Sequence, residues 1–125
     1  MDKKIKILLV EDDSMIIDMY MMRLREEGYE VIHTDKGSEA IEIAEHQKPD
    51  VVLLDVILPE VDGFTVLQTI KGGAETKDIS VIMLTNLGQE SDQNKAEELG
   101  ADGYFVKAQH TPTQIMEKIK EVINK

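Results

Sequence analysis

Three short segments of this chain are apolar at consecutive positions rather than at every second position. They are Ile7–Val10, Val51–Leu54 and Val81–Leu84. A strand with one face in water alternates apolar and polar residues, whereas a strand that is covered on both faces does not. The pattern therefore indicates a parallel sheet with helices on both sides, which restricts the chain to the α/β folds.

Five strands are expected, separated by segments of helical periodicity. Their connections have ordinary lengths, and right-handed crossovers would place helices on both faces of the sheet. We therefore predict a doubly wound, three-layer α/β sandwich with five parallel strands and five helices. The strands are predicted at Ile5–Val10, Val31–Thr34, Val51–Asp55, Val81–Thr85 and Tyr104–Lys107.

Several predicted helices have clear ends. Gly28 and Gly100 follow the first and fourth helices, in the position where glycine commonly ends a helix. The last helix should begin with Thr111 as its N-cap, Pro112 at its first position and Gln114 completing a capping box.

The composition narrows the possible functions. The 125 residues suffice for one domain, and they include 14 Lys and Arg against 25 Asp and Glu, a net charge of −11. Direct nucleic-acid binding is disfavoured, because that affinity comes mainly from cationic side chains. The absence of cysteine excludes disulfides and thiolate sites. No apolar run approaches the roughly 18 residues of a membrane span, so we expect a cytoplasmic protein.

Polar residues follow four of the predicted strands. Glu11 and Asp12 come after the first strand, Asp55 and Thr85 end the third and fourth, and Lys107 ends the fifth. Because the carboxyl ends of parallel strands lie at one edge of the sheet, these side chains should converge there. Clustered carboxylates raise one another's pKa, and a hard divalent cation such as Mg²⁺ relieves that repulsion.

This set of residues suits phosphoryl transfer. A carboxylate can act as the nucleophile and form an aspartyl phosphate. Lys107 would supply positive charge and Thr85 a hydroxyl donor to the transferred group. The three histidines have no metal-ligand spacing with one another, and we give no role to His33, His46 and His110.

Five strings, in this order and spacing, resemble one known family over essentially the whole chain. They are Ile7–Asp13, Leu53–Pro59, Asp62-Gly63, Val81–Thr85 and Gly100–Lys107. The family is the receiver domain of two-component response regulators. The resemblance implies a flavodoxin-like sheet with strand order 2-1-3-4-5. It also implies a single receiver domain over residues 1–125, with no output domain in this chain.

The resemblance also implies roles for individual residues at the acidic edge. Asp55 resembles the phosphoacceptor. Glu11 and Asp12 match the acidic pair that binds Mg²⁺ together with Asp55, and the backbone carbonyl of Ile57 matches the remaining protein ligand. The phosphoryl donor would be a histidine kinase or a histidine phosphotransfer protein.

Further residues match those that transmit the signal in the family. Thr85 and Lys107 match the residues that contact the phosphoryl group, and Thr85 and Tyr104 match the switch pair. Phosphorylation would then change the surface formed by the fourth helix, fifth strand and fifth helix, and so control a partner. Such a domain catalyses only its own phosphorylation and dephosphorylation and is not otherwise an enzyme. Tyr104 could instead be an ordinary packing residue.

Two residues depart from the family pattern. Ala108 stands where a proline, often with a cis bond, usually follows the lysine, and Asn86 stands where a small residue is common. A degenerate receiver that is never phosphorylated is therefore one alternative. An aspartate-nucleophile phosphatase is another, although Ile57 occupies the place of its usual second aspartate. Ile57 and Leu87 are both apolar, which predicts slow self-dephosphorylation.

The first predicted helix has more apolar residues than a core-facing stripe needs. Within Met15–Met22 only Asp18 is polar, so some of these side chains should be exposed. Methionine-rich surfaces adapt to partners. We hypothesise that Ile16 and Met19 form part of the docking face for the phosphodonor; the alternative is that the excess fills gaps in the core.

Overall fold

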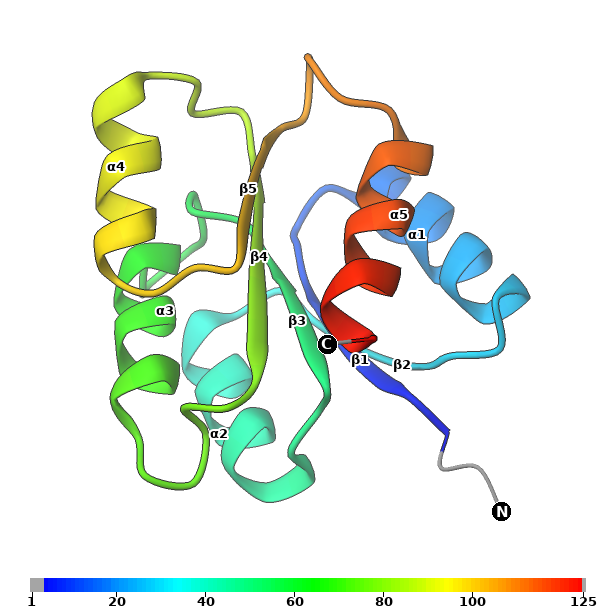
Figure 1. Cartoon of the computed structure of the whole chain (residues 1–125), viewed down its shortest axis with the longest axis horizontal. Helices are drawn as coiled ribbons and strands as arrows, with labels where there is room; N and C mark the ends of the chain where they lie inside the picture. The colour runs from blue at the N-terminus through cyan, green and yellow to red at the C-terminus, as the bar shows by residue number, and fades with distance from the viewer. Residues whose placement is uncertain (1–3, 125) are drawn as a thin grey trace.

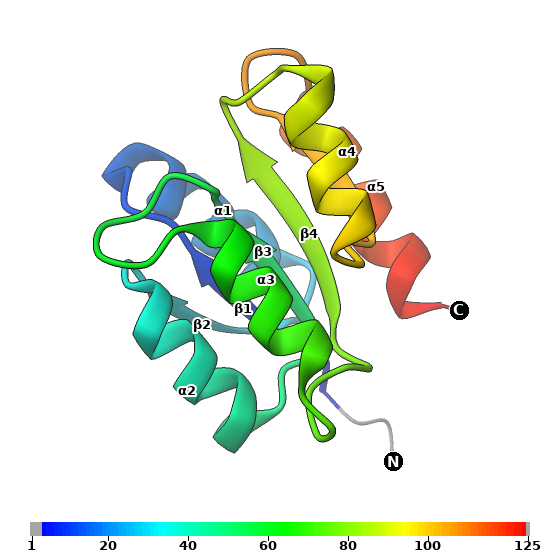
Figure 2. The same ribbon diagram turned by 90° about the vertical axis from the view of Figure 1, so that its left-hand side faces the viewer.

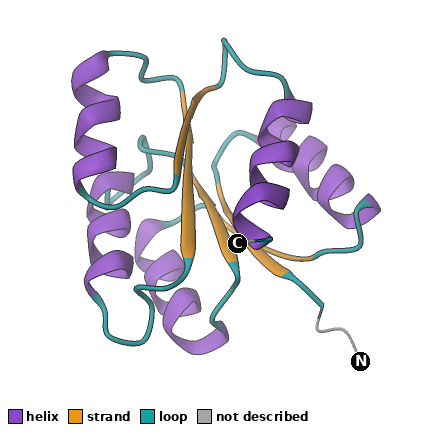
Figure 3. Cartoon of the chain, viewed as in Figure 1, coloured by secondary structure: helices purple, strands orange, loops and turns teal. Residues whose placement is uncertain are grey.

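The consecutive apolar segments form the strands of a single parallel sheet, as predicted. The computed structural model describes residues 4–124. The strand order is β2-β1-β3-β4-β5, which confirms the expected fold class. Figure 3 shows the sheet between two layers of helices. The strands are β1 (Lys6–Val10), β2 (Glu30–Thr34), β3 (Val51–Leu54), β4 (Ser80–Thr85) and β5 (Gly103–Val106).

Five helices cover the two faces of the sheet. In Figure 1, α1 and α5 lie on one side, and α2, α3 and α4 lie on the other, which Figure 2 views directly. No helix among residues 4–124 is both long enough and apolar enough to cross a membrane. The helices are α1 (Ser14–Glu26), α2 (Gly37–Gln47), α3 (Gly63–Gly72), α4 (Glu90–Glu98) and α5 (Pro112–Ile123).

Each central strand contributes to two separate cores. In β1, Leu8 and Val10 belong to the cluster on the side of α2, α3 and α4, whereas Ile7 and Leu9 belong to the cluster on the side of α1 and α5. Because successive side chains of a strand point to opposite faces, both faces must be apolar. This arrangement explains why the predicted strands lacked alternation.

The predicted helix ends are also confirmed. Gly28 and Gly100 adopt φ values of 90° and 96°, a conformation that glycine reaches without a Cβ clash. At the start of α5, the Thr111 N–H donates to Gln114 Oε1 (2.8 Å) and the Gln114 N–H donates to Thr111 Oγ1 (3.2 Å). These reciprocal bonds are the expected capping box, with Pro112 as the first helical residue.

Candidate functional site

The predicted site residues lie where strands end, at the upper edge of the sheet in Figure 1. Glu11 follows β1, Asp55 follows β3, and Thr85 is the last residue of β4. Lys107 comes directly after β5 rather than within it, and its backbone N–H donates to the carbonyl oxygen of Thr85 (2.8 Å). The β4–β5 pairing thus fixes the point from which the lysine side chain starts.

Lys107 forms ion pairs with two carboxylates. Its Nζ lies 2.6 Å from Glu11 Oε1 and 2.8 Å from Asp55 Oδ2. The exposed fractions of these three side chains are small, 12% for Lys107, 2% for Glu11 and 8% for Asp55. Water therefore screens these charges much less than it screens a surface ion pair.

The buried charges alter the proton affinity of Glu11 and Lys107. Burial raises the pKa of Glu11, and the hydrogen bonds from Lys107 and from the Asp13 N–H only partly offset that effect. For Lys107, burial lowers the pKa, but hydrogen bonds to Asp55 and Glu11, together with their charges, outweigh it and leave the pKa raised. The lysine is therefore firmly protonated between its two partners.

The backbone around Glu11 is organised by its own side chain. Glu11 Oε2 accepts hydrogen bonds from the N–H groups of Asp12 (3.0 Å) and Asp13 (3.1 Å). Asp13 in turn caps α1, because its Oδ1 accepts from the Met15 and Ile16 N–H groups (3.0 and 3.3 Å). The acidic run thus has separate roles, and Asp13 serves the helix.

Three carboxylates form a possible cation site. Glu11, Asp12 and Asp55 each offer an oxygen, and these oxygens lie within 4.8 Å of one another. Asp12 is exposed, so a cation can reach the cluster from solvent. Carboxylate oxygens are the donors that Mg²⁺ prefers, and the residues present therefore fit that ion. The Ile57 N–H donates to Asp55 Oδ1 (3.1 Å), although the use of its carbonyl as a ligand stays a prediction.

The loop between β3 and α3 folds closely against Asp55. The Gly63 N–H donates to the Val56 carbonyl oxygen (2.7 Å), and a Cβ on Gly63 would lie 2.1 Å from the Asp55 carbonyl oxygen. Asp62 caps α3, since its Oδ1 accepts from the Thr65 N–H (3.0 Å). The Asp62-Gly63 pair thus starts the helix and lets the loop approach the site.

The two predicted switch residues contact the same residue of the β4–α4 loop. Thr85 is fully buried, and its Oγ1 accepts a hydrogen bond from the Leu87 N–H (3.4 Å). The Tyr104 hydroxyl donates to the Leu87 carbonyl oxygen (2.5 Å). Burial, with added effects from the charges of Asp92 and Asp55, raises the pKa of Tyr104 to about 12, so this hydroxyl stays a donor at neutral pH.

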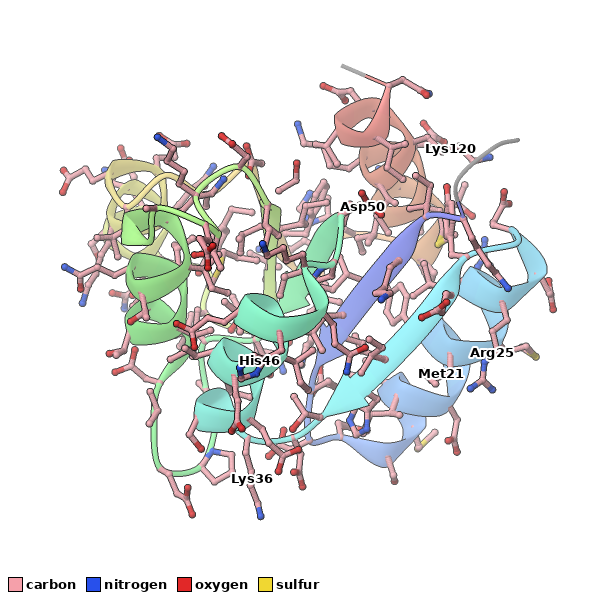
Figure 4. The ribbon with its side chains drawn as sticks, turned by 90° about the horizontal axis from the view of Figure 1, so that it is seen from below. Met21, Arg25, Lys36, His46, Asp50 and Lys120 are labelled. Carbon is pink, nitrogen blue, oxygen red and sulfur yellow. The ribbon has the colours of Figure 1, made fainter. Side chains whose placement is uncertain are left out.

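The apolar excess of α1 is exposed, but mainly at residues other than those named in the docking hypothesis. Met15 is 81% exposed and Met22 is 57% exposed. Ile16 and Met19 are half-buried and pack against the core on the side of α1 and α5. Figure 4 shows Met21 and Arg25 on the same helix. A role for Ile16 and Met19 in docking stays a prediction.

Sequence reasoning gave His33 no role, yet it supports the acidic loop. His33 Nε2 lies 2.9 Å from the carbonyl oxygen of Glu11. A carbonyl only accepts, so Nε2 must carry the proton. The signal was available in the predicted sheet: His33 is one residue from the end of β2, which pairs with β1. Such a position places its side chain near the following loop.

The structure describes both residues that depart from the family pattern, Ala108 and Asn86. No peptide bond is cis among residues 4–124, so the bond between Lys107 and Ala108 is trans. Asn86 is exposed, in contrast to the buried Thr85 before it.

Comparisons with known proteins agree with this geometry. Residues 7–120 match the sequence profile of the family described as response regulator receiver domain. The DNA-binding dual master transcriptional regulator RpaA of Synechocystis is 40% identical over 102 residues, which cover 82% of this chain and 42% of the regulator. The chain spans about half the length of the curated relatives it matches.

Solved structures of receiver domains have the same fold. A receiver domain protein from Methanospirillum hungatei has a TM-score of 0.90 at 29% identity, covering 98% of this chain and 95% of that one. The receiver domain of the sensor histidine kinase PA1611 from Pseudomonas aeruginosa, with magnesium coordinated in its active-site cleft, has a TM-score of 0.88 at 26% identity, covering 98% and 100%. This chain therefore belongs to the response regulator receiver domain family.

Proposed function

We propose that this receiver domain is a Mg²⁺-dependent signalling switch that accepts a phosphoryl group on Asp55. The observation that carries the proposal is the pairing of the Lys107 ammonium with Asp55 Oδ2 at 2.8 Å, beside the carboxylates of Glu11 and Asp12. This arrangement joins an acceptor carboxylate, a fixed positive charge and a set of hard oxygen donors. Those are the components that phosphoryl transfer requires.

In the proposed transfer, a carboxylate oxygen of Asp55 attacks the phosphorus of a phosphohistidine. The new bond joins that oxygen to phosphorus, while the bond from phosphorus to the imidazole nitrogen breaks and its electron pair stays on the imidazole. Lys107 stabilises the charge on the phosphoryl oxygens, and the Thr85 hydroxyl donates a hydrogen bond to one of them. Mg²⁺, held by Glu11, Asp12, Asp55 and the Ile57 carbonyl, would neutralise further charge on the same oxygens.

The output of the switch would pass through the β4–α4 loop. Thr85 and Tyr104 both bond to Leu87, so a movement of Thr85 toward a phosphoryl group would alter the contact that holds Tyr104. The proposed consequence is a population shift in the surface formed by α4, β5 and α5. A partner that binds one state of that surface would read the signal.

The proposed donor is a histidine kinase or a histidine phosphotransfer protein, docked over the start of α1. An Ile16→Lys variant should then accept the phosphoryl group more slowly from its protein donor, but at an unchanged rate from acetyl phosphate. Equal rates from the protein donor in both forms would remove Ile16 from the docking face.

The test of the proposed function is the intact mass of the protein after incubation with Mg²⁺ and acetyl phosphate. The wild type should gain one phosphoryl group, and Asp55→Ala should gain none. Asp35→Ala is a matched control, because Asp35 is an exposed acid that follows β2 at the same edge of the sheet. A chelator should abolish the gain. If wild type gained nothing while another receiver domain reacted in parallel, a degenerate binding module would be the better account.

A further inference from the structure

The loop that carries Lys107 connects β5 to α5. It runs from the end of β5 at Val106 to Thr111, the cap of α5, and contains no proline. Ala108 and Gln109 are exposed. Lys107 has a flexible four-carbon stem, so the position of its ammonium depends on how firmly its backbone is held.

His110 connects the far end of this loop back to β5. Its Nδ1 lies 3.2 Å from the carbonyl oxygen of Val106, and the Gln109 N–H donates to the same oxygen at 2.9 Å. Because a carbonyl oxygen only accepts, Nδ1 must carry a proton. Two hydrogen bonds therefore converge on the residue that immediately precedes Lys107.

The ring of His110 makes a second contact with the same strand. It meets the ring of Phe105 edge-on, with 5.0 Å between ring centroids and an interplanar angle of 89°. Phe105 packs against the core on the side of α1 and α5. His110 is half-buried as a result and joins the turn to a fixed part of the molecule.

The backbone of Lys107 is thus held from two sides. On one side, its N–H donates to the Thr85 carbonyl oxygen at 2.8 Å. On the other side, His110 closes the turn and leads directly into the capping box of α5. From this backbone position the lysine side chain reaches both Glu11 and Asp55.

We propose that His110 is a positioning residue for phosphoryl transfer to Asp55. It acts through its hydrogen bond to the Val106 carbonyl oxygen, and not by contact with the phosphoryl group. Its effect is to keep the Lys107 ammonium where charge develops in the transition state. This inference rests on the proposed function of Asp55.

Three substitutions separate the hydrogen bond from the ring contact. His110→Ala removes both. His110→Asn keeps an N–H donor close to the place of Nδ1, and His110→Phe keeps a ring against Phe105 without the donor. His46→Ala is the control, because His46 is exposed on α2 (Figure 4), which lies on the opposite side of the sheet from α5 (Figure 1).

The first readout is the rate of phosphorylation by acetyl phosphate, measured against donor concentration at saturating Mg²⁺. His110→Ala should lower the saturating rate about 10-fold, since misplacing a catalytic group mainly costs rate. The half-saturating donor concentration and the Mg²⁺ affinity should stay near the wild-type values. His110→Asn should recover most of the rate. His110→Phe should be as slow as His110→Ala. His46→Ala should be as fast as the wild type.

The second readout needs no phosphorylation. Long-range ¹H–¹⁵N correlation of the imidazole nitrogens, at a pH where His110 is neutral, should show the tautomer with its proton on Nδ1. Urea unfolding of every variant identifies conditions in which all are folded, so that a slow rate is not mistaken for unfolded protein.

The outcomes distinguish the inference from the proposed function. If the wild type is phosphorylated and His110→Ala reacts equally fast, the positioning role of His110 is wrong but the proposed function of Asp55 stands. The same conclusion follows if His110→Asn is as slow as His110→Ala. A proton on Nε2 would do the same. An unreactive wild type would overturn the proposed function and the positioning role together.

Discussion

Lys107 faces two buried carboxylates but carries only one positive charge. Its ammonium is 2.6 Å from Glu11 and 2.8 Å from Asp55, and Asp12 adds a third carboxylate to the cluster. The sum of these charges leaves the site negative. Burial is the main cause of the raised pKa of Glu11, and the charge of Asp55 adds a smaller effect in the same direction. The residual negative charge would favour the binding of a divalent cation there.

Gly63 is the residue whose replacement should most disturb the backbone of the site. In Gly63→Ala the new Cβ would lie 2.1 Å from the Asp55 carbonyl oxygen, and backbone atoms cannot easily move away. We expect the free energy of unfolding to fall by about 2–3 kcal/mol, as for other overpacked sites. Urea denaturation would measure the loss.

Gly72→Ala is the matched control for Gly63→Ala. Gly72 also belongs to α3, and no atom beyond its own stretch of helix lies within 4 Å of the place that a Cβ would take. Its replacement should be neutral or slightly stabilising, because alanine favours the helix. Equal stability of the two variants would contradict the steric role of Gly63.

The lifetime of the phosphoryl group should depend on Ile57. Its side chain is 58% exposed beside Asp55 and has no polar group that could orient a water molecule. We expect slow hydrolysis of the phosphorylated wild type and several-fold faster hydrolysis in Ile57→Gln, measured as loss of the phosphorylated mass with time. Met22→Gln is the control, since Met22 is equally exposed (57%) but lies on α1. Rapid Mg²⁺-dependent loss from the wild type would contradict this prediction.

Residue types at strand ends could be predicted from the sequence, whereas their pairing could not. The positions of Glu11, Asp55 and Lys107 followed from where apolar runs stop. That one ammonium contacts both acids depends on the reach and rotamer of a long side chain, which no local pattern specifies. His33 and His110 were missed for a similar reason, since each acts on a backbone carbonyl rather than through a spaced motif.

Among the helices, α4 is packed least firmly against the sheet. Ala96 is its only buried residue, whereas α5 buries Ile115, Met116, Ile119 and Val122. A further contact comes from Lys95, whose Nζ lies 4.6 Å from the centroid of the Phe64 ring on α3. A helix with so little apolar burial can change position at small cost.

The amide hydrogens of α4 should therefore exchange faster than those of α5. Local opening is easiest where few apolar side chains are buried. Hydrogen–deuterium exchange read by mass spectrometry should show Glu90–Glu98 losing protection well before Pro112–Ile123. If the amides of α4 were protected as well as those of α5, the claim that α4 is packed less firmly would be wrong.

Element boundaries were predicted well where burial determines them. The predicted strands differ from the observed ones by a residue or so at their ends, as β5 illustrates: it begins at Gly103 and ends before Lys107. Which face of α1 would be buried was harder to predict, because almost every residue of Met15–Met22 is apolar and could face the core. Its contacts with the sheet, rather than its sequence, leave Met15 and Met22 in solvent.

At the scale of the whole molecule, the net charge of −11 implies self-repulsion in the folded state, which a bound cation would reduce. Ligands that bind only the folded state stabilise it by mass action. Mg²⁺ at ten times its dissociation constant should add about 1.4 kcal/mol to the free energy of unfolding. Urea denaturation with Mg²⁺ or with a chelator would measure this increment.

The control for this increment compares two exposed acids. Asp12→Asn should lose most of the Mg²⁺ effect, and Asp35→Asn should keep it, because only Asp12 belongs to the carboxylate cluster. Equal stabilisation of both variants would assign the effect to general screening of the acidic surface.

The fold as a whole was predictable because its pattern is redundant. Val51–Leu54 alone could have been a buried helical turn, but three such segments, separated by stretches of helical periodicity, indicate a parallel sheet. The strand order came from the family resemblance and is confirmed by the pairing of β1 with both β2 and β3. Local periodicity by itself does not encode which strands become neighbours.

The most direct measurement is to locate the phosphoryl group after reaction with acetyl phosphate and Mg²⁺. Borohydride reduction converts an aspartyl phosphate into a stable alcohol, which peptide mass spectrometry can assign to one residue. We expect modification at Asp55 alone. Modification at another residue, or none when a control receiver domain is modified, would contradict the central claim that Asp55 is the phosphoacceptor.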